Sequence, residues 1–301
     1  MPNKLSYGQV QRSAMNWPIF VADELGFFRE EELAAESRVF ASPLEPVTAL
    51  AAGSLDLLNV IPDVALLEMV QGAPLAIIAN TNSRARYCLM VQSEIKTFKD
   101  LQGKKIGVND GRSAEGLILK RLLRLNGLKP DSYDLAATGA PLDRCKKLRE
   151  GVVAATMVTQ PFNFLLEEEG FRNLASSAEI VPDYPFTVCV VRRAEAFNDP
   201  ILSFLKAVSR SWQWLSDHRN RERAIPTLTQ WTGTTEKPAA ATYDLYLQPP
   251  EPPSLAPTEE GVTTVLELLA ESGRTPRPTP PARKFIDTRY FEKLQAIGIR
   301  R

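Results

Sequence analysis

The sequence has few of the residues that metal sites and disulfide frameworks require. It contains 3 cysteines and 1 histidine, His218. The cysteines, Cys88, Cys145 and Cys189, form no CxxC pair and no ligand-like grouping, and an odd number provides no disulfide framework. We therefore expect buried free thiols, no metal and no cofactor, and any nucleophilic triad would depend on His218 alone.

The sequence also lacks an excess of either charge and lacks long apolar runs. Lys plus Arg and Asp plus Glu both total 36, so the formal net charge is +0. This balance argues against a nucleic-acid partner and a polybasic membrane patch, although it allows local positive clefts. No apolar run approaches the length of a transmembrane helix. The N-terminal segment MPNKLSYGQVQRSAMN has neither the apolar region nor the cleavage site of a signal peptide.

What the sequence does contain is an alternation of strand-like and helix-like segments over residues 1–81. The strand-like segments are KLSYGQV, SRVFAS, LDLLNVI and LAIIANT, and the helix-like segments between them are NWPIFVADELGFF, PLEPVTALAAG and PDVALLEMVQG. Gly26, Gly53 and Gly72 stand where these helices should end. This alternation with short connections predicts an α/β fold in which helices cover both faces of a parallel sheet.

A second α/β set lies between two apolar strand-like runs, RYCLMVQS and TVCVVRR. The sequence therefore predicts two lobes. The first is discontinuous and contains residues 1–89 and 186–301 with the C-terminal helices, and the second contains residues 90–185. The two apolar runs would be the crossover strands, and Cys88 and Cys189, which lie on them, are candidates for neighbouring positions.

The second lobe begins with a polar elbow, NDGRS (109–113), between the strand KIGV and an amphipathic helix. It has neither the GxGxxG nor the GxxxxGK[ST] spacing of nucleotide sites. Gly111 would relax the turn and Ser113 would cap the helix, so the first backbone N–H groups of the helix could face an anionic ligand group. Arg112 could add a bidentate contact, whereas the neighbouring acidic residues have the wrong sign. An ordinary capped helix start is the alternative.

Four segments, in this order, resemble the substrate-binding proteins of ABC importers. They are WPIFVADELGFFREEEL, ALAAGSLDLLNVIPDVALLEMVQGAPL, IKTFKDLQGKKIGV and GVVAATMVTQPFNFLLEEEGFRNL. More narrowly, they resemble the branch that handles nitrate, alkanesulfonates, taurine and thiamine pyrimidine precursors. The resemblance spans about residues 1–230, and the segment IDTRYFEKL also fits. It implies a type II periplasmic-binding-protein fold with two lobes, two crossover strands and a ligand cleft that closes about a hinge.

The resemblance implies a monomeric, non-catalytic solute-binding protein that delivers a small organic anion to an ABC permease. Such proteins are periplasmic, whereas the chain as given lacks a signal peptide and would be cytoplasmic. A cytosolic lyase of the decarboxylase or dehydratase type, acting on a small carboxylate with the same fold, is the alternative. Asp63, Asp110 and Glu115 are the acidic candidates for that reaction, although their spacing forms no recognisable acid–base pair.

Ligands of open α/β sheets bind beyond the carboxyl ends of the strands, so the loops after the predicted strands contain the candidate binding residues. Arginines in these loops would hold the anionic group, because a guanidinium matches a carboxylate or sulfonate. Trp17 is a candidate stacking wall, with core packing as the alternative. The candidate ligand-binding residues are Gln9, Arg12, Ser13, Trp17, Ser42, Pro62, Thr81, Arg84, Asn109, Arg112, Ser113, Gln160, Phe162, Tyr184 and Phe186.

Overall fold

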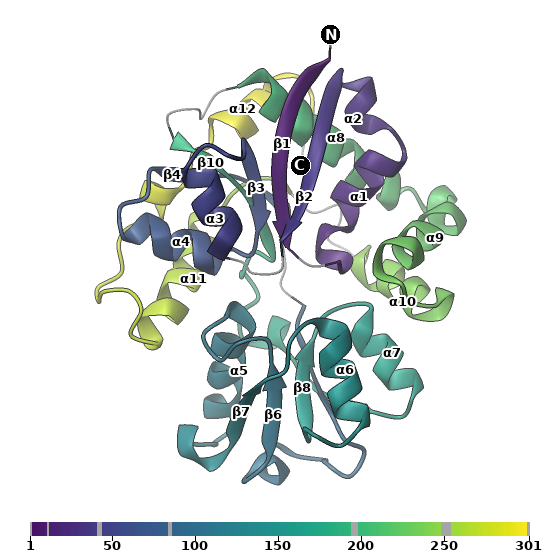
Figure 1. The fold of residues 1–301 in the computed structure, drawn as a ribbon, viewed down its shortest axis with the longest axis vertical. Coiled ribbons are helices and arrows are strands. Elements are labelled where there is room, and N and C mark those ends of the chain that lie inside the picture. The colour runs from purple at the N-terminus through teal and green to yellow at the C-terminus, as the bar shows by residue number, and fades with distance from the viewer. Residues whose placement is uncertain are drawn as a thin grey trace.

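A computed structural model of the chain describes residues 2–10, 12–40, 44–83, 86–193, 198–247 and 254–299. It contains two five-stranded sheets, with strand orders β2-β1-β3-β10-β4 and β7-β6-β8-β5-β9. Helices flank both sheets, and the two sheets lie in separate lobes, one above the other in Figure 1. The predicted two-lobe α/β fold with two mixed sheets is therefore confirmed.

The first sheet combines the N-terminal strands with one strand that returns from the second lobe. Its strands are β1 (Asn3–Val10), β2 (Leu33–Phe40), β3 (Leu57–Val60), β4 (Leu75–Asn82) and β10 (Thr187–Arg192). β1 pairs in parallel with β2 and β3, whereas β10 runs antiparallel between β3 and β4. Every residue of β3 and β4 is buried, as expected for strands that helices cover on both faces.

The second sheet has the same plan. Its strands are β5 (Cys88–Val91), β6 (Lys105–Val108), β7 (Asp134–Ala137), β8 (Ala155–Val158) and β9 (Arg172–Ser176). β6 is parallel to β7 and β8, and β5 is antiparallel to β8 and β9. In each sheet, therefore, the antiparallel strand is the one that arrives from the other lobe. Because β5 already belongs to the second sheet, we propose a lobe boundary just before Cys88 rather than at 89/90, and keep 185/186 as the second boundary.

The helices of the first lobe come from both ends of the chain, whereas those of the second lobe are consecutive. The helices of the two lobes together are α1 (Trp17–Glu24), α2 (Phe27–Glu30), α3 (Leu44–Ala51), α4 (Pro62–Val70), α5 (Ala114–Leu125), α6 (Pro141–Arg149), α7 (Phe162–Glu168), α8 (Asp199–Ser216), α9 (Arg221–Thr232), α10 (Glu236–Tyr246), α11 (Glu259–Glu271) and α12 (Arg289–Ala296). α8 packs against α1, α2 and the first sheet, and α11 packs against α4. Within the described ranges, no helix has the length and apolar character needed to cross a membrane.

Glycines end the first helices, as the sequence predicts. Gly26, Gly53 and Gly72 have φ values of 77°, 81° and 105°. This left-handed conformation is strained for residues that have a Cβ atom, which explains why glycine occupies each of these positions. Gly26 separates α1 from α2, so the predicted single helix NWPIFVADELGFF is divided at that residue.

All three cysteines are buried free thiols, as expected. Cys88 lies in β5, where it pairs with Val158 and Ser176 of the second sheet. Cys189 lies in β10 of the first sheet, between β3 and β4. The expectation that Cys88 and Cys189 are neighbours is wrong, because the two crossing segments enter different sheets.

Candidate ligand-binding site between the lobes

Loops at the carboxyl ends of the parallel strands bring the two lobes into direct contact. The N–H group of Ala14, which follows β1, donates to the carbonyl of Gln160, which follows β8, at 3.2 Å. The carboxylate of Asp63, at the start of α4, accepts a hydrogen bond from the N–H group of Ala114, at the start of α5. Both contacts join a loop of the first sheet to a loop of the second, which is where the fold predicts a ligand.

A cavity of about 530 Å³ lies beside these contacts and has walls from both lobes. This volume is in the range of roughly 300–1,000 Å³ that is typical of small-molecule sites. The first lobe contributes the beginning of α3, the first turns of α4 and the segment after α11, and the second lobe contributes the elbow. The lining residues are Leu44, Asp63, Val64, Leu67, Glu68, Asn109, Asp110, Arg112, Ser113 and Arg274.

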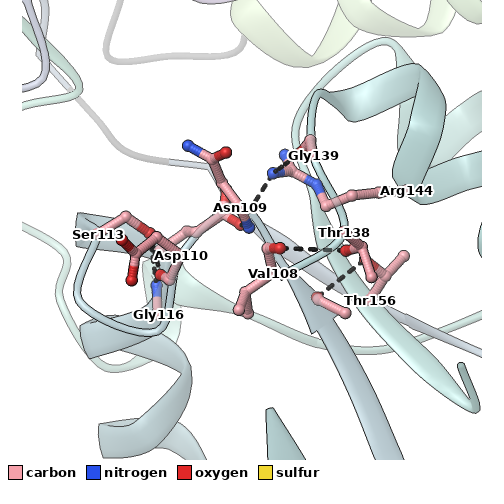
Figure 2. Close-up of polar contacts among 11 residues, drawn as sticks. Val108, Asn109, Asp110, Ser113, Gly116, Thr138, Gly139, Arg144 and Thr156 are labelled. Atoms are coloured by element: carbon pink, nitrogen blue, oxygen red, sulfur yellow. Dashed lines mark hydrogen bonds and ion pairs between the residues drawn. The ribbon is translucent and has the colours of Figure 1, made fainter. Parts of the chain in front are cut away.

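The elbow between β6 and α5 is held by its own hydrogen bonds (Figure 2). The Ser113 hydroxyl accepts from the N–H of Gly116 at 3.4 Å and donates to the carbonyl of Asp110 at 2.6 Å. A Cβ atom on Gly116 would lie 2.5 Å from that carbonyl oxygen, so the elbow packs directly on this glycine. Gly111 has no left-handed φ, and its nearest neighbour would be 3.7 Å away. The predicted cap at Ser113 is present, but the essential glycine is Gly116 rather than Gly111.

The protein's own carboxylates bond two backbone N–H groups of the elbow, one of which, that of Ala114, we expected to face a ligand. Asp63 bonds the N–H of Ala114, and the carboxylate of Glu115 accepts the N–H of Asn109. Glu115 also pairs with Arg144 at 2.9 Å, and these two side chains are 6% and 1% exposed. The elbow is therefore an internally satisfied helix start, because negative groups already occupy the positive end of α5.

Burial shifts the protonation of the groups around the contact between Asp63 and α5. It raises the pKa of Asp63 to about 6, against the opposing effects of Arg274 and of backbone N–H groups. Burial also raises the pKa values of Tyr87 and Tyr184 well above the usual value. The carboxylates of Glu115 and then Asp63 add to this rise for Tyr87, and that of Asp63 adds to it for Tyr184. Both phenols therefore stay protonated near neutral pH and can donate hydrogen bonds.

The predicted arginines have different positions. Arg112 lines the cavity, its side chain is 81% exposed, and its Nε lies 4.0 Å from a carboxylate oxygen of Asp110. Arg12 is exposed and lies over the ring of Trp231, 5.3 Å from the ring centroid. Arg84 and Ser42 lie outside the described residues. The structure adds one arginine that the sequence did not indicate, Arg274.

Several predicted aromatic contacts belong to the core instead. The indole of Trp17 is fully buried, and its Nε1 donates to the hydroxyl of Thr227 at 2.8 Å. Phe162 is part of the core of the second lobe. Phe186 is also buried, and its ring meets that of Tyr87 edge-on at 5.3 Å. Trp17 and Phe162 are thus packed in the core, and their contact with a ligand stays a prediction.

Four further predicted residues have internal roles. The hydroxyl of Thr81 bonds Asn59, and it lies 2.8 Å from the hydroxyl of Thr187. Gln9 donates to the hydroxyl of Ser37 at 2.9 Å, and the Ser13 hydroxyl accepts from the N–H of Met15 at 3.4 Å. Pro62 is the first residue of α4. The loops are therefore positioned by their own polar contacts.

A different set of buried side chains retains polar atoms that have no partner in the described parts of the chain. It contains the predicted residues Gln160 and Tyr184, together with Asn82, the last residue of β4, and Thr159, the first residue after β8. Within the described residues, no three Cys, His, Asp or Glu side chains form a group that could hold a metal ion.

Sequence comparison connects this architecture to known proteins. The family model described as "NMT1/THI5 like" matches residues 14–222. A Brucella abortus protein named "Putative binding protein" is 28% identical over 177 residues, which are 58% of this chain and 54% of that protein. The match thus covers about half of the relative's length.

Solved structures share the fold along nearly the whole chain. The alkanesulfonate-binding protein SsuA from Xanthomonas axonopodis, bound to MOPS, has a TM-score of 0.76 at 19% identity and covers 95% of this chain and 99% of its own. The periplasmic nitrate-binding protein NrtA from Synechocystis has a TM-score of 0.79 at 15% identity, and the match covers 99% of this chain and 90% of that protein. The chain therefore shares the fold of these two binding proteins. Because the family model matches more than half of this chain, the chain belongs to the NMT1/THI5-like family.

Proposed function

We propose that the chain captures a small organic anion between its lobes and delivers it to an ABC permease. The observation that carries this proposal is the cavity of about 530 Å³, which has walls from both lobes and one arginine from each, Arg112 and Arg274. A ligand that contacts both lobes stabilises their closed arrangement, which is the differential binding that a solute-binding protein requires.

Two carboxylates in the same cavity, Asp63 and Asp110, are already engaged, and this supports an anionic ligand. Asp63 is directed toward the N–H groups at the starts of α4 and α5. The carboxylate of Asp110 accepts the backbone N–H of Arg112 at 2.8 Å. The guanidinium of Arg112 is mostly exposed and presents planar donors that match a carboxylate or sulfonate. The similar structures named for alkanesulfonate and nitrate binding also have anionic ligands.

The test is a thermal-shift panel of small carboxylates and sulfonates, followed by calorimetry on Arg112→Ala. A true ligand at 100 times its Kd stabilises the fold by about 2.7 kcal/mol. We expect Arg112→Ala to lower affinity by about tenfold or more, because the ligand charge loses its partner in a partly dry cavity. Arg219→Ala is the matched control, since Arg219 is 90% exposed and follows Asp217 in the same two-residue arrangement, away from the cavity lining.

Equal affinity in both variants, or a best ligand that is a cation or a neutral hydrocarbon, would refute the anionic part of the proposal. No stabilisation by any member of a broad panel of small solutes would refute solute binding itself.

Asp63 supports one second candidate function, a lyase. A buried carboxyl whose pKa is raised to about 6 beside a cavity has the properties of a general acid or base. Tyr184 lies close enough to interact with it electrostatically. NMR of a bound small carboxylate would show conversion to product if the protein is a lyase, and Asp63→Asn would stop that conversion. Release of the intact ligand would exclude the lyase for that compound.

A further inference from the structure

Four buried side chains near the segments that join the lobes have polar atoms without a partner among the described residues. The atoms are Asn82 Nδ2, Thr159 Oγ1, Gln160 Oε1 and Tyr184 OH. We refer to these four residues as the hinge subsite. Their side chains are at most 4% exposed. A buried polar atom without a partner costs about 1–3 kcal/mol, and native proteins keep few of them, so several together point to a bound group.

A chain of contacts connects the segments that carry these residues. The carbonyl of Asn82, at the end of β4, accepts the N–H of Phe186 at 2.8 Å. The ring of Phe186 lies 5.3 Å from that of Tyr87. Cys88, the next residue, accepts a hydrogen bond from Gln160 Nε2 at 3.6 Å. The loop after β8 therefore contacts the first crossing segment, and Tyr87 of that segment packs against Phe186 of the second.

Tyr184 connects the hinge subsite to the cavity. Its phenol interacts electrostatically with Asp63 and with Tyr87. Asp63 also lines the cavity of about 530 Å³ that contains Arg112. Asp63 thus interacts with Tyr184 of the hinge subsite and also lines the cavity that contains the exposed arginine.

The donor and acceptor pattern selects the chemistry of the bound group. Asn82 presents a donor, Gln160 presents an acceptor, and the hydroxyls of Thr159 and Tyr184 can do either. A carboxylate only accepts, so it would leave the Gln160 oxygen facing another acceptor. A carboxamide accepts from Asn82 and donates to Gln160. We infer that the hinge subsite binds an amide-like edge of the ligand, while the anionic group of the ligand lies toward Arg112. This inference rests on the proposed function.

The surrounding side chains favour a planar ligand. The rings of Tyr87 and Tyr184 are 2% and 1% exposed, and that of Tyr87 already packs edge-on against Phe186. Aromatic rings gain most from another planar group in an offset or edge-on arrangement. A small aryl ring with a carboxamide at one end and a carboxylate at the other satisfies both ends of the site, and 3-carbamoylbenzoate is a suitable probe.

The experiment is calorimetry of the full chain with 3-carbamoylbenzoate, isophthalate, benzoate and benzamide. We expect 3-carbamoylbenzoate to bind at least about tenfold more tightly than isophthalate, because only the amide can donate to Gln160. Gln160→Met should remove this preference, and Tyr184→Phe should weaken 3-carbamoylbenzoate by about tenfold. Tyr243→Phe is the control. Its buried hydroxyl donates to the carbonyl of Leu215 at 2.9 Å, so this variant should lose stability and keep the preference.

The possible results separate this inference from the proposed function. Equal binding of the three anions overturns the hinge subsite and leaves the anionic ligand in place. Equal binding of benzamide and 3-carbamoylbenzoate, without binding of benzoate, supports the subsite and removes the anionic group. Tighter binding of isophthalate means that Gln160 presents its amide donors and overturns the inference. So does a preference that survives Gln160→Met, or a failure of all four probes to bind.

Discussion

Asp63 makes a direct contact between the two lobes. It follows Pro62 at the start of α4 and is 3% exposed. Its carboxylate receives N–H groups from its own helix and from Ala114 of α5, and Arg274 lies nearby. Two helix N-termini from different lobes therefore share one acid, an arrangement that helix dipoles favour and that burial opposes.

Asp63 should make the stability of the protein depend on pH between about 4 and 6. Its folded-state pKa is raised from 3.8 to about 6, so the folded state binds the proton more tightly than the unfolded state. The protonated carboxyl therefore stabilises the fold fully below about pH 4, and this contribution is lost as the pH rises through 6. We expect a loss on the order of 3 kcal/mol in the free energy of unfolding between pH 4 and 7.

Urea unfolding of the parent and of Asp63→Asn at both pH values measures this effect. The difference in stability between the two proteins should shift by that amount in favour of the variant as the pH rises. Tyr87 and Tyr184 interact with Asp63 and stay protonated throughout, so neither contributes a slope in this window. A difference that does not change with pH would mean that Asp63 titrates normally.

At the scale of elements, the elbow shows how one strand-to-helix junction is held. The cap residue Ser113, the carbonyl of Asp110 and the first turn of α5 form a compact unit (Figure 2). Gly116 is inside the helix, where glycine normally costs stability relative to alanine. Its presence is explained by the backbone of residues 110–111, which occupies the space that a Cβ atom would need.

Gly116→Ala should therefore destabilise the protein despite the higher helix propensity of alanine. The added Cβ would meet the Asp110 carbonyl oxygen at 2.5 Å and the Gly111 carbonyl carbon at 2.8 Å, and backbone atoms cannot move aside cheaply. We expect a loss of about 1–3 kcal/mol in the free energy of unfolding, measured by urea denaturation. Gly111→Ala is the control and should be nearly neutral, since its nearest neighbour would be 3.7 Å away. Similar stability in both variants would contradict this account of the elbow.

At the scale of the whole molecule, charged side chains connect the lobes outside the cavity. Glu271 at the end of α11 pairs with Arg121 and Arg124 of α5, each at 3.2 Å. At the wall of the cavity, Arg274 donates to the carbonyl of Arg112. These pairs are partly exposed, so each contributes little to global stability, but together they favour contact between the lobes.

Glu271→Gln should loosen the lobes without unfolding them. We expect a loss below about 1 kcal/mol in unfolding free energy, together with a larger radius of gyration of the ligand-free protein in small-angle X-ray scattering. High salt should produce the same expansion in the parent, because exposed ion pairs are screened. Asp244→Asn, which breaks a pair with Arg221 inside the first lobe, should leave the radius unchanged. An unchanged radius for Glu271→Gln would show that these pairs do not hold the lobes.

The sequence by itself determined the elements and the class of fold. Apolar periodicity, the helix-ending glycines and the Ser113 cap are local properties, and strand–helix alternation with short connections allows few arrangements. Strand ends could also be located, so Gln160, Tyr184 and Arg112 were identified as candidates. A Pro-Asp pair directly after a strand was a usable signal for Asp63, because proline and acidic residues favour the first turn of a helix.

Only the tertiary structure decided which side chains face the site. Trp17 and Phe162 have the same local setting as a binding residue, but distant partners enclose them in the core. Arg144 lies in a charged helix and gives no local sign that it pairs with Glu115 in the interior. Arg274 reaches the cavity from the segment after α11, far along the chain. Burial and pairing depend on residues that the fold brings together, and no pattern within one segment contains that information.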